Sequence, residues 1–215
     1  MDYLRYILYG TELVAAVTGF VFRDKIRGTP WKWFLFYLFF IVAFETIGEI
    51  LFQFDCKTLA DHFYTYIVIP FQFISLYFIF YVQDKNNNSK KWLLSLITGY
   101  LLSICLEKFL HTGMNDWFDN LSYTIGVIGL VIFAIRYFDK LIQSEALLHF
   151  KNDLMFWVAT GVLFFYLGTL PYWGVPQSVS KKMPDFMTGY WFVQILLDIT
   201  MYLLFTLGFI WKKQK

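Results

Sequence analysis

The sequence contains few charged residues, few cysteines and few prolines, and each shortage excludes a class of protein. Charged residues make up 16% of the 215 residues, whereas soluble domains contain about 25%, so an ordinary soluble enzyme domain is excluded. Two cysteines cannot build a disulfide framework or a metal knuckle. The balance of 18 basic and 16 acidic residues gives a net charge of +2. This balance excludes nucleic acid as an expected partner, since such partners select strongly basic surfaces.

Apolar and aromatic residues are abundant and indicate a polytopic membrane protein. They make up 58% and 23% of the chain, and the mean hydropathy is +0.52. A bilayer core of about 30 Å requires ~20 helical residues to cross. Backbone groups in lipid must bond within their own segment, which a helix achieves. We therefore predict an all-α protein with one domain over residues 1–215 and seven transmembrane helices, with spans expected at 3–22, 33–54, 63–83, 92–110, 119–138, 153–172 and 188–210.

Two further expectations concern the first span and one of the connections. Asp2 offsets Arg5 and Glu12 interrupts the first apolar run, so we expect a retained first span rather than a cleavable signal. The connection at 137–152 is expected to extend its neighbouring helices.

Lysine and arginine counts predict the orientation. Connections alternate between the two sides of the bilayer, and 13 of the 18 basic residues fall on one side. Because short cytoplasmic loops are enriched in Lys and Arg, we predict an outside N-terminus and a cytoplasmic C-terminus. The expected location is a bacterial inner (cytoplasmic) membrane, and the lipid bilayer is the first expected partner.

Carboxylates inside the predicted spans are the main clue to function. Each charged carboxylate at mid-bilayer costs at least about 3 kcal/mol, so these acids are expected to face the bundle interior, share protons or lie near the interface. Their depths place them from mid-membrane to the outer face. No Lys or Arg lies deep enough to pair with Glu12, Glu45 or Asp198. Membrane bundles also use buried acids to join helices, and this purely structural role is the alternative. The predicted ligand or ion site comprises Glu12, Glu45, Glu49, Gln72, Glu107, Asp198, Tyr66, Tyr123, Tyr166, Gln194 and Tyr202.

These residues favour a seven-helix sensor or receptor-like protein. A small cationic or polar amphiphilic ligand would enter an outward-facing acidic cavity, and the signal would pass to a separate cytoplasmic or membrane partner, because no connection is long enough to form an output domain. Two alternatives remain open. The same carboxylates could serve a proton- or cation-coupled transporter or channel, or the chain could be a structural or assembly subunit of a membrane complex.

Enzymatic and cofactor chemistry receive little support from the sequence. Glu107 and His111 lie four residues apart at the end of a span, and His62 lies in a neighbouring connection, so these three residues are candidate metal ligands. An intramembrane metal hydrolase requires several ligands, and no histidine lies inside a span, so we expect no enzyme. We expect no cofactor: a retinal protein needs a Schiff-base lysine in its last span, and 188–210 contains none. Cys56 and Cys105 could form a disulfide if both lie at an oxidising outer face.

Three short stretches resemble a known type of protein. They are TELVAAVTGF in the first span, SYTIG in the fifth and FYLGTLPYW in the sixth. On these stretches the chain resembles small bacterial seven-helix integral membrane proteins of similar length. The resemblance implies a seven-helix protein and transfers no functional residue.

Overall fold

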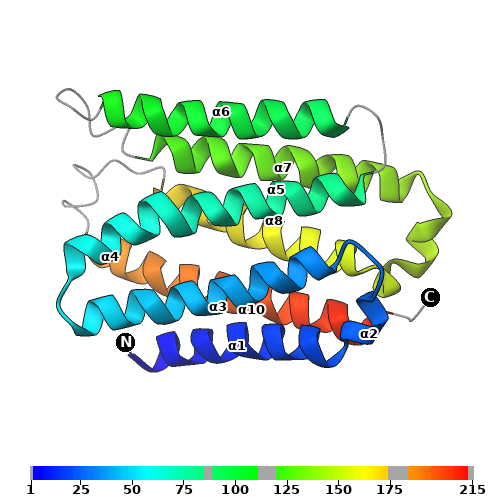
Figure 1. The fold of residues 1–215 in the computed structure, drawn as a ribbon, viewed down its shortest axis with the longest axis horizontal. Helices are drawn as coiled ribbons and strands as arrows, with labels where there is room; N and C mark the ends of the chain where they lie inside the picture. Colours follow the sequence, from blue (N-terminus) through cyan, green and yellow to red (C-terminus); the bar gives the residue numbers. More distant parts are fainter. Residues whose placement is uncertain (1, 85–88, 111–119, 174–183, 213–215) are drawn as a thin grey trace.

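The computed structural model describes residues 2–84, 89–110, 120–173 and 184–212 and is all-α (Figure 1). Seven of its helical segments are long and apolar enough to cross a membrane, which confirms the predicted fold class. In chain order the elements are α1 (Asp2–Val21), α2 (Arg23–Ile26), α3 (Lys32–Gln53), α4 (Lys57–Phe63), the π-helix η1 (Tyr64–Val68), α5 (Ile69–Gln83), α6 (Ser89–Leu110), α7 (Leu121–Ile142), the 3-10 helix η3 (Glu145–Asn152), α8 (Leu154–Trp173) and α10 (Pro184–Trp211).

The third span begins earlier than the sequence predicts and contains a wide turn. It runs continuously over Lys57–Gln83, six residues longer at its start than expected, because the polar stretch of α4 lowers the local hydropathy without ending the helix. Pro70 explains the π-helix that follows α4. A proline has no backbone N–H and its ring crowds the carbonyl four residues back, here that of Tyr66, and a local π adjustment is one response of a membrane helix to a proline. Here the Ile69 N–H donates to the carbonyl of Tyr64, five residues back.

The fifth span ends at Ile142, four residues later than the predicted 138. Arg136 and Lys140 lie inside α7, which continues to Ile142. Both cations approach Asp84 at the end of α5, so pairing accommodates them within the helix. The connection after α7 extends that helix as expected, but residues 145–152 form a separate 3-10 helix.

The helices run side by side along the long axis of the molecule (Figure 1). α10 packs mainly against α8 and α1, while α7 contacts α8, α6 and α5. We call the end where α1 begins and α3 ends the N-terminal end, and the end where α1 and α10 finish the opposite end. Figure 1 shows α1 and α6 at opposite edges of the bundle, so α10, α8 and α5 lie between them.

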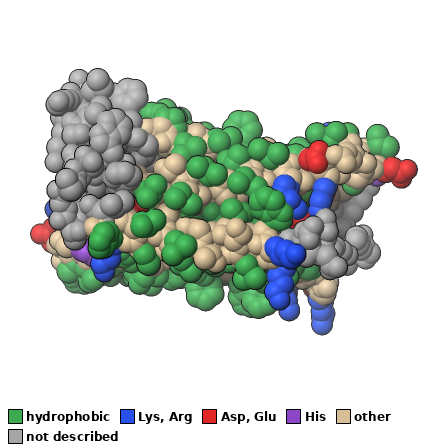
Figure 2. Space-filling view, turned by 90° about the horizontal axis from the view of Figure 1, so that it is seen from above, with side chains coloured by type: hydrophobic (Ala, Val, Ile, Leu, Met, Phe, Trp, Pro, Cys, Tyr) green, Lys and Arg blue, Asp and Glu red, His purple; other side chains and the backbone are tan. Residues whose placement is uncertain are grey.

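The outside of the bundle is apolar over most of its length. Large side chains such as Phe36, Leu102, Ile135 and Leu196 are exposed there, and Figure 2 shows hydrophobic side chains covering the middle of the molecule and charged ones gathering at its ends. Exposed apolar surface of this extent requires lipid as its solvent. The chain is therefore an integral membrane protein.

Small residues allow aromatic side chains to enter the centre of the bundle. A Cβ atom added at Gly126 would lie 2.8 Å from the ring of Phe73. Phe73 is fully buried and contacts the rings of Tyr77, Tyr100, Tyr123 and Tyr166. Close approach at glycine is typical of membrane helix packing, so the glycines of α7 serve packing here.

Candidate functional site

An acidic cavity lies between α1 and α3 in the half of the bundle near the N-terminal end. Its volume is about 280 Å³. It extends from the buried Glu12 to the exposed Gln53, the last residue of α3. Glu45 and Glu49 line the same cavity, because residues four apart share one face of a helix. The other lining residues are Tyr9, Val42, Thr46 and Ile50.

Glu12 is the most deeply placed acid of this cavity and has no hydrogen-bond or ion-pair partner within the described part of the chain. Its exposed fraction is 3%, and among the described residues no side chain or backbone group forms a hydrogen bond or ion pair with its carboxylate. Buried polar groups in native proteins are almost always satisfied, and an unsatisfied buried carboxylate costs more than a neutral group. A ligand or water in the cavity would supply the missing partner.

Glu45 is held in place by a tyrosine from the π-helix. The hydroxyl of Tyr64 donates to Glu45 Oε2 at 2.7 Å. Tyr64 crosses α3 at Gly48, where an added Cβ would lie 2.6 Å from Tyr64 Cε2. Tyr64 is the first residue of the π-helix that precedes Pro70, and Gly48 leaves room for its ring. The wide turn and the glycine together position the hydrogen bond between Tyr64 and Glu45.

Glu49 lies at the mouth of the cavity and has several partners. Arg5 Nη2 lies 3.6 Å from Glu49 Oε2, and the hydroxyl of Tyr9 donates to the same oxygen at 3.0 Å. Gln53 Nε2 lies 3.5 Å from Oε1. Arg5 also lies 5.7 Å from the centre of the Phe52 ring. The mouth is thus electrically balanced, whereas the inner part is not.

The acidic set continues from the cavity into the centre of the bundle. Glu12 lies within electrostatic range of both Glu45 and Asp198, and Asp198 also interacts with Glu45. Asp198 forms no hydrogen bond within the described part of the chain. Three carboxylates from α1, α3 and α10 therefore face one region, and no described Lys or Arg pairs with any of them.

Tyrosines surround this inner region. Tyr37 and Tyr202 are buried and lie within electrostatic range of Glu12, Glu45 and Asp198. The hydroxyl of Tyr37 is buried and has no hydrogen-bond partner among the described residues. The unpaired hydroxyl of Tyr37 therefore lies in the same polar region as Glu12, whose carboxylate borders the cavity.

Two further tyrosines of the predicted site lie farther along the bundle. Tyr123 and Tyr166 both lie within electrostatic range of Asp198. The hydroxyl of Tyr123 shares a hydrogen bond with Thr169 Oγ1 at 2.8 Å, so this tyrosine joins α7 to α8.

Apolar packing closes the region on the side of the opposite end. Phe34 packs against Phe205 and Phe209, with ring centres 5.1 and 5.7 Å apart. These three rings, together with Ala15 and Ala16 of α1, are completely buried. The polar region therefore ends at an aromatic layer between α1, α3 and α10.

Four residues of the predicted site lie elsewhere or make no bond to the acids. Tyr66 is 50% exposed on the bundle surface, beside the ring of His62. Glu107 Oε2 accepts the backbone N–H of Ser122 at 2.7 Å and so caps α7, a role favourable to the helix dipole. Gln72 and Gln194 are half-buried and make no hydrogen bond to a described residue.

The candidate metal ligands are not assembled in the described residues, which contain no group of three His, Cys, Asp or Glu side chains suited to a metal ion. His62 Nδ1 lies 2.6 Å from the carbonyl of Thr58, and His111 lies outside the described residues. Cys56 and Cys105 are both free and exposed.

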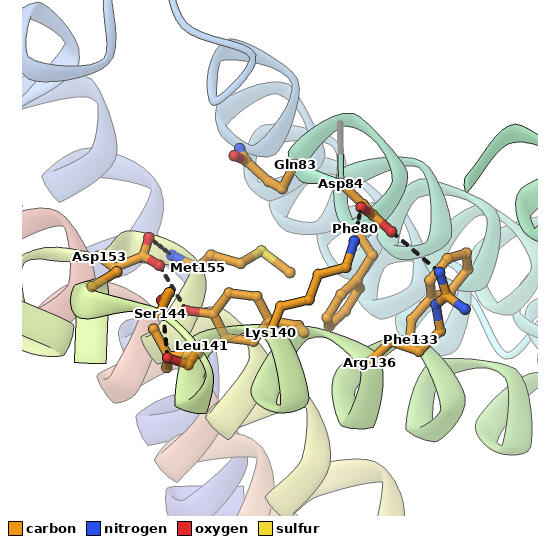
Figure 3. A pocket seen from close by; sticks show the side chains of 12 residues that line it. Phe80, Gln83, Asp84, Phe133, Arg136, Lys140, Leu141, Ser144, Asp153 and Met155 are labelled. Carbon is orange, nitrogen blue, oxygen red and sulfur yellow. Dashed lines mark hydrogen bonds and ion pairs between the residues drawn. The ribbon is translucent and has the colours of Figure 1, made fainter. Parts of the chain in front are cut away.

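A second cavity of about 530 Å³ lies at the opposite end, between α5, α7, η3 and α8 (Figure 3). Asp84 lies between Lys140 and Arg136 and pairs with both. Across the cavity, the hydroxyl of Tyr137 donates to Asp153 Oδ2 at 2.7 Å, and Asp153 Oδ1 accepts the N–H of Met155. Two cations and two carboxylates balance each other here, so this cavity holds no excess charge.

Sequence reasoning missed Arg5, Tyr9, Tyr37 and Tyr64. A signal existed for the first two, because Arg5, Tyr9 and Glu12 are spaced by four and three residues and share one face of α1. The sequence prediction used Arg5 only to judge the retained first span and the orientation. Tyr64 carried no comparable signal, since its direction depends on the π turn.

Comparisons with protein-family models, with curated proteins and with solved structures find no match to the chain.

Proposed function

We propose that the protein is a seven-helix receptor-like membrane protein that binds a small organic cation in the acidic cavity. The observation that carries this proposal is Glu12, a carboxylate that is almost fully buried, lines a cavity and has no partner among the described residues. Intramembrane ionisable residues mark functional sites by default.

The charge of the site selects a cation. Arg5 pairs with Glu49 at the mouth and lies within electrostatic range of Glu45. Glu12, Glu45 and Asp198 lie within electrostatic range of one another, and none of the three forms an ion pair with a cation of the described residues. Ionised carboxylates repel one another in a medium of low dielectric constant, and one ammonium group among them would replace that repulsion by attraction.

The size and shape of the cavity select a small amphiphile. Pockets for drug-sized ligands measure about 300–1,000 Å³, so about 280 Å³ suits a molecule at the lower limit. Val42 and Ile50 give the cavity an apolar wall beside its acids. A primary amine attached to a compact apolar group matches both surfaces.

The aromatic layer favours binding over transport. A transporter needs a polar route to both sides of the membrane, whereas Phe34, Phe205 and Phe209 fill the bundle next to the acids. If ion or amine flux into proteoliposomes nevertheless follows a pH gradient, the transport alternative replaces the receptor proposal.

The test of binding uses 2-phenylethylamine and its neutral analogue 2-phenylethanol, which differ in the ammonium group. We expect the amine to raise the thermal unfolding midpoint of the detergent-solubilised protein in a saturable manner and the alcohol to have no such effect. Glu45→Gln and Asp198→Asn should each weaken amine binding about 30-fold, because removing one member of a buried charge pair costs ~2 kcal/mol.

Glu145→Gln is the matched control. Glu145 is an exposed acid on η3, far in sequence from the cavity, and its replacement should leave amine binding unchanged. Equal stabilisation by amine and alcohol, or equal binding by wild type and both cavity variants, would refute the proposal and favour acids that only join helices.

In this proposal the ligand enters from outside the cell and the output leaves through a separate partner in the cytoplasm. Asp198 lies on α10, which reaches the opposite end, where Lys25 Nζ donates to the carbonyl of Ile210 at 2.8 Å. Ligand binding would shift α10 against α8 and so change the surface presented at that end. The basic side chains at that end support its assignment to the cytoplasmic side, and the membrane that we propose is a bacterial inner membrane.

Cysteine labelling tests the orientation. Cys56 is exposed between α3 and α4 at the N-terminal end. In a Cys105→Ser background, we expect a membrane-impermeant maleimide to label Cys56 in intact cells as fully as in lysed cells. Lys90→Cys, placed in a background without natural cysteines, should react only after lysis. The reversed pattern would place the N-terminus in the cytoplasm.

A further inference from the structure

The chain between α1 and α3 folds into a basic hollow at the opposite end of the bundle from the acidic cavity. Its volume is about 440 Å³. Arg23, Arg27 and Lys32 line it, together with a single acid, Asp24. The lining therefore carries two more positive than negative charges.

The cations of this hollow have no counter-ion among the described residues. Within the described residues no carboxylate, Asp24 included, lies within ion-pair distance of Arg23, Arg27 or Lys32. The cations of the second cavity differ, since Arg136 and Lys140 share Asp84. An arginine presents a planar fork of N–H donors that suits phosphate oxygens, and the guanidinium group of Arg27 forms no hydrogen bond with any described residue.

The turn that builds the hollow is fixed to the bundle. Ile26 is buried, and its carbonyl accepts both the N–H and the hydroxyl of Thr29, at 3.1 and 2.6 Å. Gly28 has a φ of 74°, a conformation that glycine adopts without strain. The basic residues on either side are thus held by a defined turn.

An apolar surface suited to lipid chains lies next to the hollow. Arg23 lies over the ring of Phe20, 4.5 Å from its centre, and Phe20 packs edge-to-face on Phe39, ring centres 6.2 Å apart. Both rings are exposed on the apolar outside of the bundle. Leu35 belongs to the lining of the hollow itself.

We infer that this hollow binds the phosphate of an anionic phospholipid headgroup, with the acyl chains lying along Leu35 and the Phe20–Phe39 pair. Cations at the level of the headgroups attract anionic lipids. The exposed rings of Phe20 and Phe39 beside Arg23 favour a lipid over a free phosphate ion, because only a lipid has acyl chains to cover them. This inference is independent of the amine site and can fail or succeed separately.

Native mass spectrometry of the detergent-solubilised protein tests the inference. Titration with dioleoyl phosphatidylglycerol and dioleoyl phosphatidylcholine compares two headgroups on identical chains. We expect the first lipid to bind with at least about tenfold higher affinity. Each removed cation should weaken its binding about fivefold, so that Arg23→Gln/Arg27→Gln/Lys32→Gln abolishes the preference.

Lys90→Gln/Lys91→Gln/Lys151→Gln is the matched control, since it removes three exposed cations that do not line the hollow. It should keep the headgroup preference. If the test triple variant does not fold, the single Arg27→Gln should still weaken phosphatidylglycerol binding about fivefold.

A separate titration with inorganic phosphate distinguishes the source of the phosphate group. Calorimetric binding of phosphate to the wild type but not to the test variant, together with equal affinity for the two lipids, would overturn the lipid assignment in favour of a free anion. Equal affinity for both lipids without phosphate binding, or equal reductions in the test and control variants, would refute the site.

Discussion

Replacing Glu12 by lysine is expected to raise the thermal stability of the protein and to abolish amine binding. The new ammonium group would lie in the region that Glu45 and Asp198 face, where no described cation forms an ion pair with either acid, although Arg5 lies within electrostatic range of Glu45. Repulsion among three carboxylates would become attraction around one positive charge. The cavity of about 280 Å³ beside Glu12 provides the space for the longer side chain.

Two further substitutions at the same position separate charge from volume. Glu12→Gln removes the charge and keeps the shape, and it should give intermediate stability. Glu12→Leu removes every polar atom and should not reproduce the gain of lysine. Amine binding should weaken at least about 30-fold in Glu12→Lys, because removing one member of a buried charge pair costs ~2 kcal/mol or more. Thermal unfolding with and without 2-phenylethylamine measures both effects.

Two results would contradict the prediction for Glu12→Lys. Amine binding retained by Glu12→Lys would place the ligand elsewhere. A Glu12→Lys protein that unfolds while Glu12→Gln remains folded would show that the acids do not share a site for a cation, and it would favour carboxylates that serve only to join helices.

Much of the fold could be predicted from the sequence because the bilayer sets the length and hydropathy of each span. All seven spans coincide with helices of the structure. The largest differences are the third span, which begins at Lys57, and the fifth, which continues past the charged Asp139 and Lys140 to Ile142. Which helices pack together could not be predicted, since every span has more than one apolar face.

The candidate site could be predicted only in part. Glu12, Glu45 and Asp198 could be selected because buried acids without a paired cation are costly in lipid, and the structure brings them into electrostatic range. Their role in binding stays a prediction. The exposure of Tyr66 and the capping role of Glu107 depend on the direction of single side chains, and neither hydropathy nor spacing supplies that information.

Tyr64 shows most clearly why the remaining contacts of the site could not be predicted from the sequence. The proline at position 70 signals that a carbonyl must be satisfied, but several responses are available to a helix, including a kink or a bound water. The chain adopts a π turn, and the hydroxyl of Tyr64 reaches Glu45 across Gly48. This hydrogen bond depends on the placement of two helices that only the structure specifies.

Gly129→Ala is expected to lower the free energy of unfolding by about 2–4 kcal/mol. A Cβ atom at Gly129 would lie 2.7 Å from Cζ of Tyr77. Tyr77 is fully buried, and its hydroxyl donates to the carbonyl of Gly126 at 2.7 Å. Overpacking costs about 1–3 kcal/mol, and displacing the hydroxyl would break a buried hydrogen bond worth ~1 kcal/mol or more. Thermal and chemical unfolding in detergent measure the change.

Gly99→Ala is the matched control, because an added Cβ at this glycine of α6 meets nothing within 4 Å. It should leave stability unchanged or raise it by up to about 1 kcal/mol through helix propensity. Tyr77→Phe in the Gly129→Ala background should recover part of the stability, since it removes the hydroxyl that the new methyl group meets. A double-mutant cycle between the two positions should therefore be non-additive. Additive effects, or equal destabilisation at Gly129 and Gly99, would contradict the close approach of α5 and α7 on which the aromatic centre of the bundle depends.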